Sequence, residues 1–504
     1  MFENLINYLP GVSSPTKRLT FKDRLKWTGL VLLMFLVLGQ IKVFGVKEEA
    51  LARFGILEQI MASTMGSLIT LGIGPIVTAS IILQLLVGSG IISWNLQSEE
   101  GRARFQGTQK LLAILFCIFE AYAYVAFGAI PAKSATLMPI VIAQIAFGGF
   151  IILLMDEVVS KWGIGSGISL FIAAGVTKRI FVSALNPLVP TGSELPSGLI
   201  PQFISYLGLG LIKNAVLTLL PILATILVFV IVVYVQDIKV EIPLAFGSFS
   251  GFGRRWPLKF IYTSNIPVIL TAALLANLHM IGSMTAKTVH EGVRCGILGC
   301  VNSNGTFTSG VLYYLSAPRG VPQIQIFFLV FATVVFLGIL SSVFLVKKKY
   351  KEIIVTSIIL GFLLALFIDM FFVGLPDVTS VIRALTYLLF MMIGATIFSV
   401  FWVETSGMDA HSVAEQIKSI GMQVPGFRRD PRIVEKVLSR YIMPLAVMGA
   451  LFVGLVAALA DFTGALGTGT GILLTVMIIY NFYEQISMRY MEDMNPMVRK
   501  FFEK

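Results

Sequence analysis

Ionisable side chains inside long apolar stretches are the first candidates for chemistry in this sequence. Glu120 lies in the middle of LLAILFCIFEAYAYVAF, and Asp369 and Arg383 lie near the ends of other apolar runs. Burying a charge in lipid is costly, so such residues are functional candidates by default. Glu120 could relay a proton, or it could be a protonated or hydrogen-bonded residue that holds helices together. The sequence offers no matched second carboxylate, and both interpretations stay open.

An intramembrane serine protease is the enzyme class to test against this sequence. Ser166 lies between Gly165 and Gly167, but the GxSG spacing fails at Ile164. The three histidines do not supply a base: His290 and His411 are expected in loops, and His279 at a helix end. We therefore predict no catalytic residue and no enzyme.

Glycine-rich and cysteine motifs also fail as cofactor sites. GIGSG at 163–167 and GTGTG at 467–471 neither follow a strand nor match GxGxxG, so nucleotide binding is rejected. Small residues at helix starts and crossings, where helices approach closely, explain them better. Three cysteines, Cys117, Cys295 and Cys300, are too few for a metal cluster or a disulfide scaffold. No cofactor and no metal are expected.

Composition decides which elements must position these residues. The chain has 504 residues, of which 56% are hydrophobic and only 13% charged. A soluble domain of this size does not need so much apolar surface, so the class is a polytopic membrane protein. Apolar runs of about 20 residues without period-two alternation favour helices over a barrel. The sequence thus predicts an all-α polytopic membrane protein.

About twelve apolar runs have spanning length. They are Trp27–Val46, Gly66–Ile92, Leu111–Ile130, Leu137–Met155, Gly163–Leu185, Ala215–Val235, Phe260–Ile281, Ile324–Val346, Ile353–Val373, Val381–Trp402, Tyr441–Ala460 and Leu466–Ile486. With both termini inside, most of the 38 Lys and Arg residues fall in cytoplasmic segments. The positive-inside rule therefore supports an N-in, C-in topology, and it accounts for most of the net charge of +11 without a nucleic acid.

Two of these runs are interrupted in the same way. Gly66–Ser89 contains Gly72, Gly74 and Pro75, and Ser264–Asn277 carries Pro267 in a similar place. Proline disfavours helix for the preceding residue, so each helix should begin at its proline. Irregular backbone at membrane depth is tolerated only against protein or a water-filled cavity. Such a pair in corresponding positions of two halves indicates inverted repeats with a site between them.

Three segments are expected outside the spans. Ala50–Met65 is a surface loop or a short helix that folds back into the cavity. Gly282–Gly320 is the longest external loop, and it contains CGILGC and the acceptor pattern Asn304-Gly305-Thr306. Val403–Arg440 is a long cytoplasmic loop with a GFRR turn.

A series of ordered blocks resembles one known family. TLGIGPIVTASIILQLLVGSG, FQGTQKLL, DEVVSKWGIGSGISLFIAAGV, VEIPLAFG, YTSNIPVIL, FWVETSG, GFRR, RYIMPL and GALGTGTGILL occur in this order. Together they resemble SecY, the channel subunit of the Sec protein translocon, in its archaeal branch, along nearly the whole chain. The resemblance implies two inverted halves of five helices, at 1–213 and 214–504. It also implies a multi-pass protein of the cell membrane that conducts unfolded polypeptides and releases hydrophobic segments into lipid.

The resemblance assigns an apolar ring and a plug. The pore ring would consist of Ile73, Val77, Ile168, Ile172, Ile266, Ile269 and Leu474. Side chains of this kind can close a constriction by dewetting. The plug would consist of Gly55, Ile56, Leu57, Glu58, Gln59, Ile60, Met61, Ala62, Ser63, Thr64 and Met65.

The resemblance also implies a gate and partners. A polar cluster of Thr78, Glu120 and Asn265 would cross the lateral gate, which gives Glu120 a third interpretation. Cytoplasmic loops would contact the ribosome and its RNA through Arg254, Arg255, Arg428, Arg429 and Arg440. The implied partners are the small subunits SecE (gamma) and Sec-beta, the ribosome with its nascent chain, a targeting receptor, signal peptides and membrane lipid.

One departure from the family lies between Tyr313–Gly320 and Phe401–Gly407. The family has one span there and this sequence has three, so 324–373 is interpreted as an inserted helical hairpin. An even number of added spans leaves the downstream topology unchanged. The rival function is an inverted-repeat secondary transporter of a small solute. The lack of paired charges near the helix breaks and the large basic loops disfavour it.

Overall fold

The computed structural model describes most of the chain. The described residues are 10–17, 19–47, 66–88, 90–94, 98–126, 130–189, 195–246, 253–286, 288–290, 293–302, 306–318, 321–344, 350–370, 374, 376–419, 422–423 and 431–493. The expected plug, Gly55–Met65, lies outside them, as do Asn304, Arg428 and Arg429.

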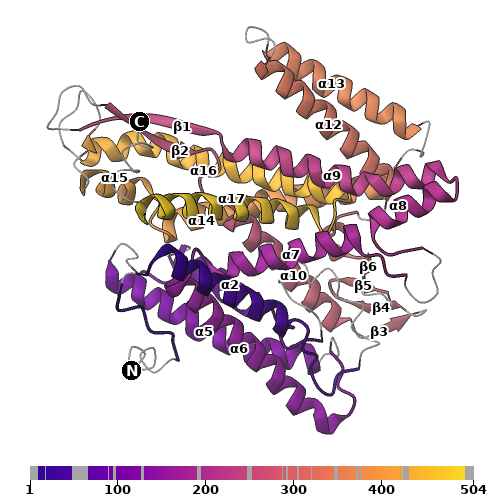
Figure 1. The fold of residues 1–504 in the computed structure, drawn as a ribbon, viewed down its shortest axis with the longest axis horizontal. Coiled ribbons are helices and arrows are strands. Elements are labelled where there is room, and N and C mark those ends of the chain that lie inside the picture. The colour runs from indigo at the N-terminus through magenta and orange to yellow at the C-terminus, as the bar shows by residue number, and fades with distance from the viewer. Residues whose placement is uncertain are drawn as a thin grey trace.

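Helices dominate the fold (Figure 1). They are α2 (Phe21–Leu38), α4 (Gly74–Gly88), α5 (Glu99–Ala126), α6 (Met138–Trp162), α7 (Gly167–Leu185), α8 (Leu199–Gly208), α9 (Ile212–Gln236), α10 (Ile266–Thr285), α11 (Val311–Tyr314), α12 (Pro322–Phe344), α13 (Tyr350–Ile368), α14 (Val378–Thr405), α15 (Ala410–Ser419), α16 (Pro431–Phe462) and α17 (Gly469–Asp493), with a 3₁₀ turn at Ala135–Leu137. Each of the twelve apolar runs overlaps one long helix. Within the described residues, eight helices are long and apolar enough to cross a membrane, and α4 and part of α13 are shorter apolar helices.

The expectation of an all-α chain needs a correction, because two small sheets form in segments that were expected to be loops. The first has the order β2-β1-β7, with β1 at Lys239–Phe246, β2 at Gly253–Lys259 and β7 at Met422–Gln423. The second has the order β3-β4-β5-β6, with strands at Thr288–His290, Val293–Gly296, Gly299–Val301 and Phe307–Ser309. All of their pairings are antiparallel. The strands of the second sheet have only three or four residues and depend on tight turns between neighbours, and helical periodicity reveals neither sheet.

Prolines begin the two interrupted helices, as the sequence predicts. Helix α4 starts at Gly74 with Pro75 in its first turn, after a series of turns from Gly66 to Ile73. Helix α10 has Pro267 at the same point, with Asn265 as its N-cap. Proline suits the first helical turn because the amide hydrogen that it lacks would have no helical partner there.

The expected hairpin is formed by α12 and α13, which pack antiparallel and project from one edge of the bundle (Figure 1). Gly338 allows the close approach, because a Cβ there would lie 1.9 Å from Ser357 Oγ. The hairpin contacts the bundle through the first turns of α12. The ring of Phe328 lies 4.9 Å from that of Phe462 of α16 in a tilted arrangement, and Gln325 packs against Gly464.

Candidate functional site

Residues of the expected pore ring come together in the main hydrophobic cluster. Ile73 precedes α4 and Val77 lies on it, Ile172 lies on α7, Ile269 on α10 and Leu474 on α17, and all five are less than 10% exposed. Ile168 and Ile266 are partly buried and pack against the same cluster. Four helices that are distant in sequence thus contribute β-branched or leucine side chains to one apolar centre.

A cleft opens onto this centre. Its volume is about 540 Å³. Val77, Ile168, Ile266 and Ile269 of the ring line it together with Ile76 and Leu270. The remaining lining is mostly polar and comes from α4, α5, α14 and the start of α7: Ser80, Gln84, Arg102, Gln106, Gln109, Ser166, Ser169, Thr405 and Ser406. Apolar and polar side chains thus line the same cleft, and the apolar ones include four residues of the expected ring.

A polar cluster joins α4, α5 and α10. Thr78 Oγ1 lies 3.1 Å from Glu120 Oε1 and 2.9 Å from the carbonyl oxygen of Gly74, and it accepts a hydrogen bond of 3.1 Å from Asn277 Nδ2. Glu120 is only 2% exposed. Among the described residues, Glu120 Oε2 and Asn277 Oδ1 have no hydrogen-bond partner. Hence the cluster is held by few bonds through one hub, Thr78.

The third member of this cluster differs from the expected one. Asn265 caps α10 and accepts from Ser264 Oγ at 3.1 Å, and no hydrogen bond between it and Thr78 or Glu120 is formed in the described part of the chain. Asn277, three helical turns further along α10, occupies that place instead. An asparagine in the apolar helix 266–285 was the signal that could have identified it, because such residues rarely face lipid.

Helix α4 packs against both α10 and α14 beside the cluster. At its end, Gly88 lies so close to α14 that a Cβ would meet Phe401 Cδ1 at 2.7 Å. On the other side, Gly394 of α14 faces Thr271 of α10, with 2.6 Å from the built Cβ to Thr271 Cγ2. We call the contact of α4 and α5 with α10 and α14 the seam.

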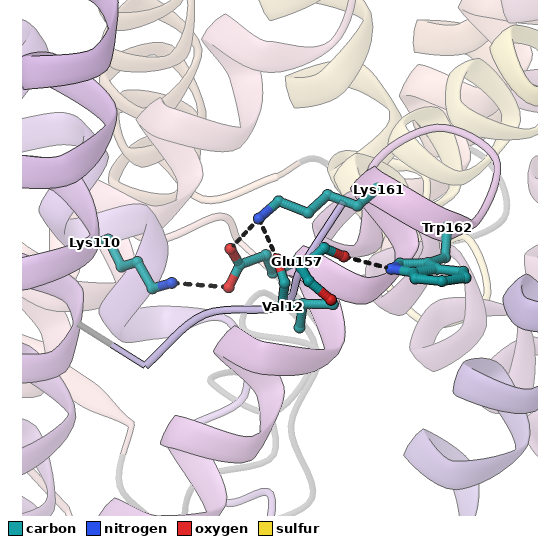
Figure 2. Close-up of polar contacts among 6 residues, drawn as sticks. Val12, Lys110, Glu157, Lys161 and Trp162 are labelled. Carbon is teal, nitrogen blue, oxygen red and sulfur yellow. Dashed lines mark hydrogen bonds and ion pairs between the residues drawn. The ribbon is translucent and has the colours of Figure 1, made fainter. Parts of the chain in front are cut away.

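The middle of α5 is anchored to α6, which also binds the N-terminal segment (Figure 2). Lys110 Nζ lies 2.8 Å from Glu157 Oε2, and Lys161 Nζ lies 2.7 Å from Glu157 Oε1. Lys161 also donates to the carbonyl oxygen of Val12, while Trp162 Nε1 donates to that of Ser13 at 2.8 Å. The ion pair of Lys110 fixes the middle of α5 to α6, and the polar cluster joins α5 to α4 nearer its C-terminal end.

The other intramembrane charges lie away from the seam. Arg383 donates to the carbonyl oxygens of Ser316 and Ala317 at 2.8 and 3.1 Å, and its guanidinium lies 4.4 Å from the ring centroid of Tyr313. It therefore ties α14 to the segment after α11. Asp369 is fully buried at the end of α13, and its carboxylate has no hydrogen-bond partner among the described residues.

The basic positions lie on the side of the bundle that carries β1 and β2. Arg254 and Arg255 belong to β2, opposite Leu244 and Pro243 of β1. Arg440 is exposed on α16. Beyond the seam, Cys295 and Cys300 are directly opposite each other on β4 and β5 and form a disulfide.

Comparisons with known proteins agree with this geometry. The family model of SecY matches residues 67–483. "Protein translocase subunit SecY" of Methanococcus vannielii is 41% identical over 497 residues, covering 99% of this chain and 98% of that protein. A solved structure described as "The structure of a protein conducting channel" has a TM-score of 0.77 and 40% identity, with 98% of each chain covered. "Sec61 in the Canine ribosome-channel complex from the endoplasmic reticulum" has a TM-score of 0.74 at 40% identity, again with 98% of each chain covered.

Proposed function

The chain belongs to the SecY family, and we propose from this that it is the protein-conducting channel of a Sec translocon. It passes unfolded secretory polypeptides across the cell membrane and releases hydrophobic segments sideways into lipid. The observation that carries the proposal is the cleft, in which Val77, Ile168, Ile266 and Ile269 of the expected ring lie among polar side chains. A ring of branched side chains yields to a passing peptide without binding it, whereas ions meet a dry constriction.

The seam is the proposed lateral gate. Opening it separates α4 and α5 from α10 and α14, which breaks the hydrogen bond of Asn277 with Thr78 and leaves the contact of Thr78 with Glu120 on one side. Interhelical hydrogen bonds in membranes stabilise by only about 0.6 kcal/mol each on average, so a seam of this kind is held closed weakly. In this arrangement Glu120 needs no proton-relay role. Gly55–Met65 is proposed as the plug on the family resemblance alone.

The proposed topology has both termini in the cytoplasm and two inverted halves, 1–213 and 214–504, with the α12–α13 hairpin as an addition to the second half. The distribution of Lys and Arg supports the orientation. In this orientation β1, β2 and α15 face the cytoplasm, and β3 to β6 face outward. The outward position suits the disulfide of Cys295 and Cys300, because disulfides persist outside the reducing cytosol.

The proposed partners are the ribosome with its nascent chain, a targeting receptor, and the small subunits SecE (gamma) and Sec-beta. The Sec61 relative is described in a ribosome–channel complex, which supports the first. Arginine suits ribosomal RNA because its planar fork binds phosphate through paired hydrogen bonds. Arg254 and Arg255 on the β1–β2 hairpin, and Arg428 and Arg429, are therefore the proposed contacts.

The decisive experiment reconstitutes the chain with a SecE partner in liposomes. We expect a secretory polypeptide to become protected from protease inside the vesicles, whereas no small solute accumulates against its gradient. Substitution of Arg383 by Lys, away from the cleft, is a control that should keep transport. Concentrative uptake of a small solute without polypeptide transport would instead establish the transporter alternative.

A further inference from the structure

The base of the β1–β2 hairpin is tied to one turn of α17. Asp237, which follows α9 and precedes β1, accepts a hydrogen bond of 2.8 Å from Tyr480 Oη. Lys259, the last residue of β2, forms an ion pair with Glu484. The Lys259 ammonium also lies 5.6 Å from the centroid of the Tyr480 ring. Both ends of the hairpin are thus held by the same helix.

Asn481, on the same turn, holds the start of α10. Its Nδ2 donates to Ser264 Oγ at 2.9 Å. Ser264 has a φ of 57°, and it is the one residue other than glycine with a positive φ in the described part of the chain. L-residues rarely adopt this conformation, so its surroundings must impose it. Because α10 begins two residues later at Ile266, the Asn481 contact helps to fix the direction in which α10 leaves the hairpin.

The pore ring is close to these contacts on both helices. Ile266 and Ile269 lie in the first turn of α10. Leu474 precedes Tyr480 on α17 by less than two turns, or about 9 Å of helix. A displacement of the hairpin therefore acts on the ring through α10 and α17 together.

We propose that Tyr480, Asn481 and Glu484 are positioning residues that couple the cytoplasmic hairpin to the pore ring. The hairpin supplies the surface for a partner, and the turn of α17 transmits the movement of that partner to Leu474, Ile266 and Ile269. The proposal rests on the proposed function for the identity of the partner, the ribosome. The physical linkage itself is independent of that identity.

The strength of the linkage follows from its exposure. The side chains of Lys259 and Glu484 are 39% and 33% exposed, so solvent screens the pair and its contribution is modest. Reversing one charge brings two like charges together, and reversing both recreates the pair in the opposite sense. A matched control is the ion pair of Arg104 and Glu100 at 2.7 Å, which lies within α5 and joins no second element.

The test uses the full chain in lipid bilayers, with Glu484→Lys, Lys259→Glu, the double reversal, and Glu100→Lys as control. Thermal unfolding and gel filtration establish that each variant is folded. With ribosomes as probe, we expect Glu484→Lys to keep ribosome affinity within about twofold. The change in the channel's ion conductance when a ribosome binds should fall about threefold, as an ion pair of this exposure implies. The double reversal should restore the response, and Glu100→Lys should leave it unchanged.

A second measurement needs no ribosome. Amide hydrogen exchange in the first turn of α10 should be faster in Glu484→Lys and in Asn481→Leu than in the parent, and the double charge reversal should return it to the parent rate. Parent-like exchange in folded Glu484→Lys and Asn481→Leu would overturn the coupling. A loss of amide protection in Glu484→Lys that the double reversal fails to restore would overturn it as well. If the parent neither binds ribosomes nor transports polypeptide, the proposed function fails, while the exchange measurement still decides the linkage.

Discussion

Replacing Thr78 by Val is the sharpest perturbation of the seam. Valine has nearly the shape of threonine, but it lacks the hydroxyl that contacts both Glu120 and Asn277. Two interhelical hydrogen bonds disappear while the packing of α4 stays the same. Only the bond from Asn277 crosses the seam, because Thr78 and Glu120 both lie on its α4–α5 side. At about 0.6 kcal/mol, its loss favours the separated helices about threefold.

The assay is the hydrophobicity at which a test segment leaves the channel for lipid. One leucine at the centre of a segment contributes about 0.5 kcal/mol to insertion. A loss of about 0.6 kcal/mol from the closed seam therefore corresponds to about one leucine in the insertion threshold. We expect Thr78→Val to admit segments with about one leucine fewer than the parent requires. Half-maximal insertion across a leucine series measures this directly.

The control for this experiment is Thr271→Val. Thr271 is fully buried on α10, but its hydroxyl donates only along its own helix, to the carbonyl oxygen of Pro267 at 2.8 Å. Its substitution should leave the threshold in place. A folded Thr78→Val variant with the parental threshold would refute the reasoning, because the polar cluster would then contribute nothing to gating. An equal shift in Thr271→Val would show that general changes in helix polarity explain the result.

Three further predictions address the ring, the disulfide and the partner surface. Replacing Ile73, Ile172 and Ile269 together by Asn should wet the constriction and raise the resting ion leak in single-channel recordings. A parental leak would contradict the ring assignment. Membrane-impermeant thiol reagents should label Cys295 and Cys300 from outside only after reduction, and labelling from the cytoplasmic side alone would reverse the topology. Replacing Arg254, Arg255, Arg428 and Arg429 by Glu should weaken ribosome co-sedimentation. It should also flatten the salt dependence of binding by about 0.7–0.9 in log–log slope per lost phosphate contact. Equal binding of variant and parent across a salt series would leave these residues as topology signals.

Sequence reasoning located the helices well because each carries a strong local signal. Long apolar runs identified every span-length helix, and Pro75 and Pro267 marked where α4 and α10 begin. The apolar ring was proposed through the family resemblance and stays a prediction, and its residues lie in or against the main hydrophobic cluster. Such features depend on the residue itself or on its neighbours in sequence.

Features that depend on contacts between residues distant in the sequence could not be predicted from local signals. Asn265 precedes α10 as its N-cap and Asn277 lies in the middle of that helix, and only the crossing of α4 over α10 selects Asn277 as the partner of Thr78. The two sheets were missed for a related reason. Strands of three or four residues, such as β4 and β5, carry no periodicity of their own, and their pairing stabilises them.

The two glycine-rich turns have the same structural role: each precedes a helix whose start is bound by a carboxylate of the helix before it. GIGSG begins α7, where Asp156 Oδ1 of α6 accepts from the Ile168 amide at 2.9 Å. GTGTG begins α17, where Asp461 of α16 accepts from the hydroxyl of Thr470, and its Oδ1 lies 3.4 Å from the amide of that residue. A carboxylate at a helix N-terminus satisfies free amides and complements the helix dipole.

Glycine is required at both turns by close approach. A Cβ at Gly167 would lie 2.6 Å from Asp156 Cα, and one at Gly469 would lie 1.9 Å from the carbonyl carbon of Ala460. Each turn is followed by a helix that carries residues of the expected ring: Ile168 and Ile172 on α7, and Leu474 on α17. The same device, a carboxylate of one helix against a glycine-rich start of the next, thus recurs at the ends of 1–213 and 214–504. Its recurrence in both segments supports the proposal of two inverted halves.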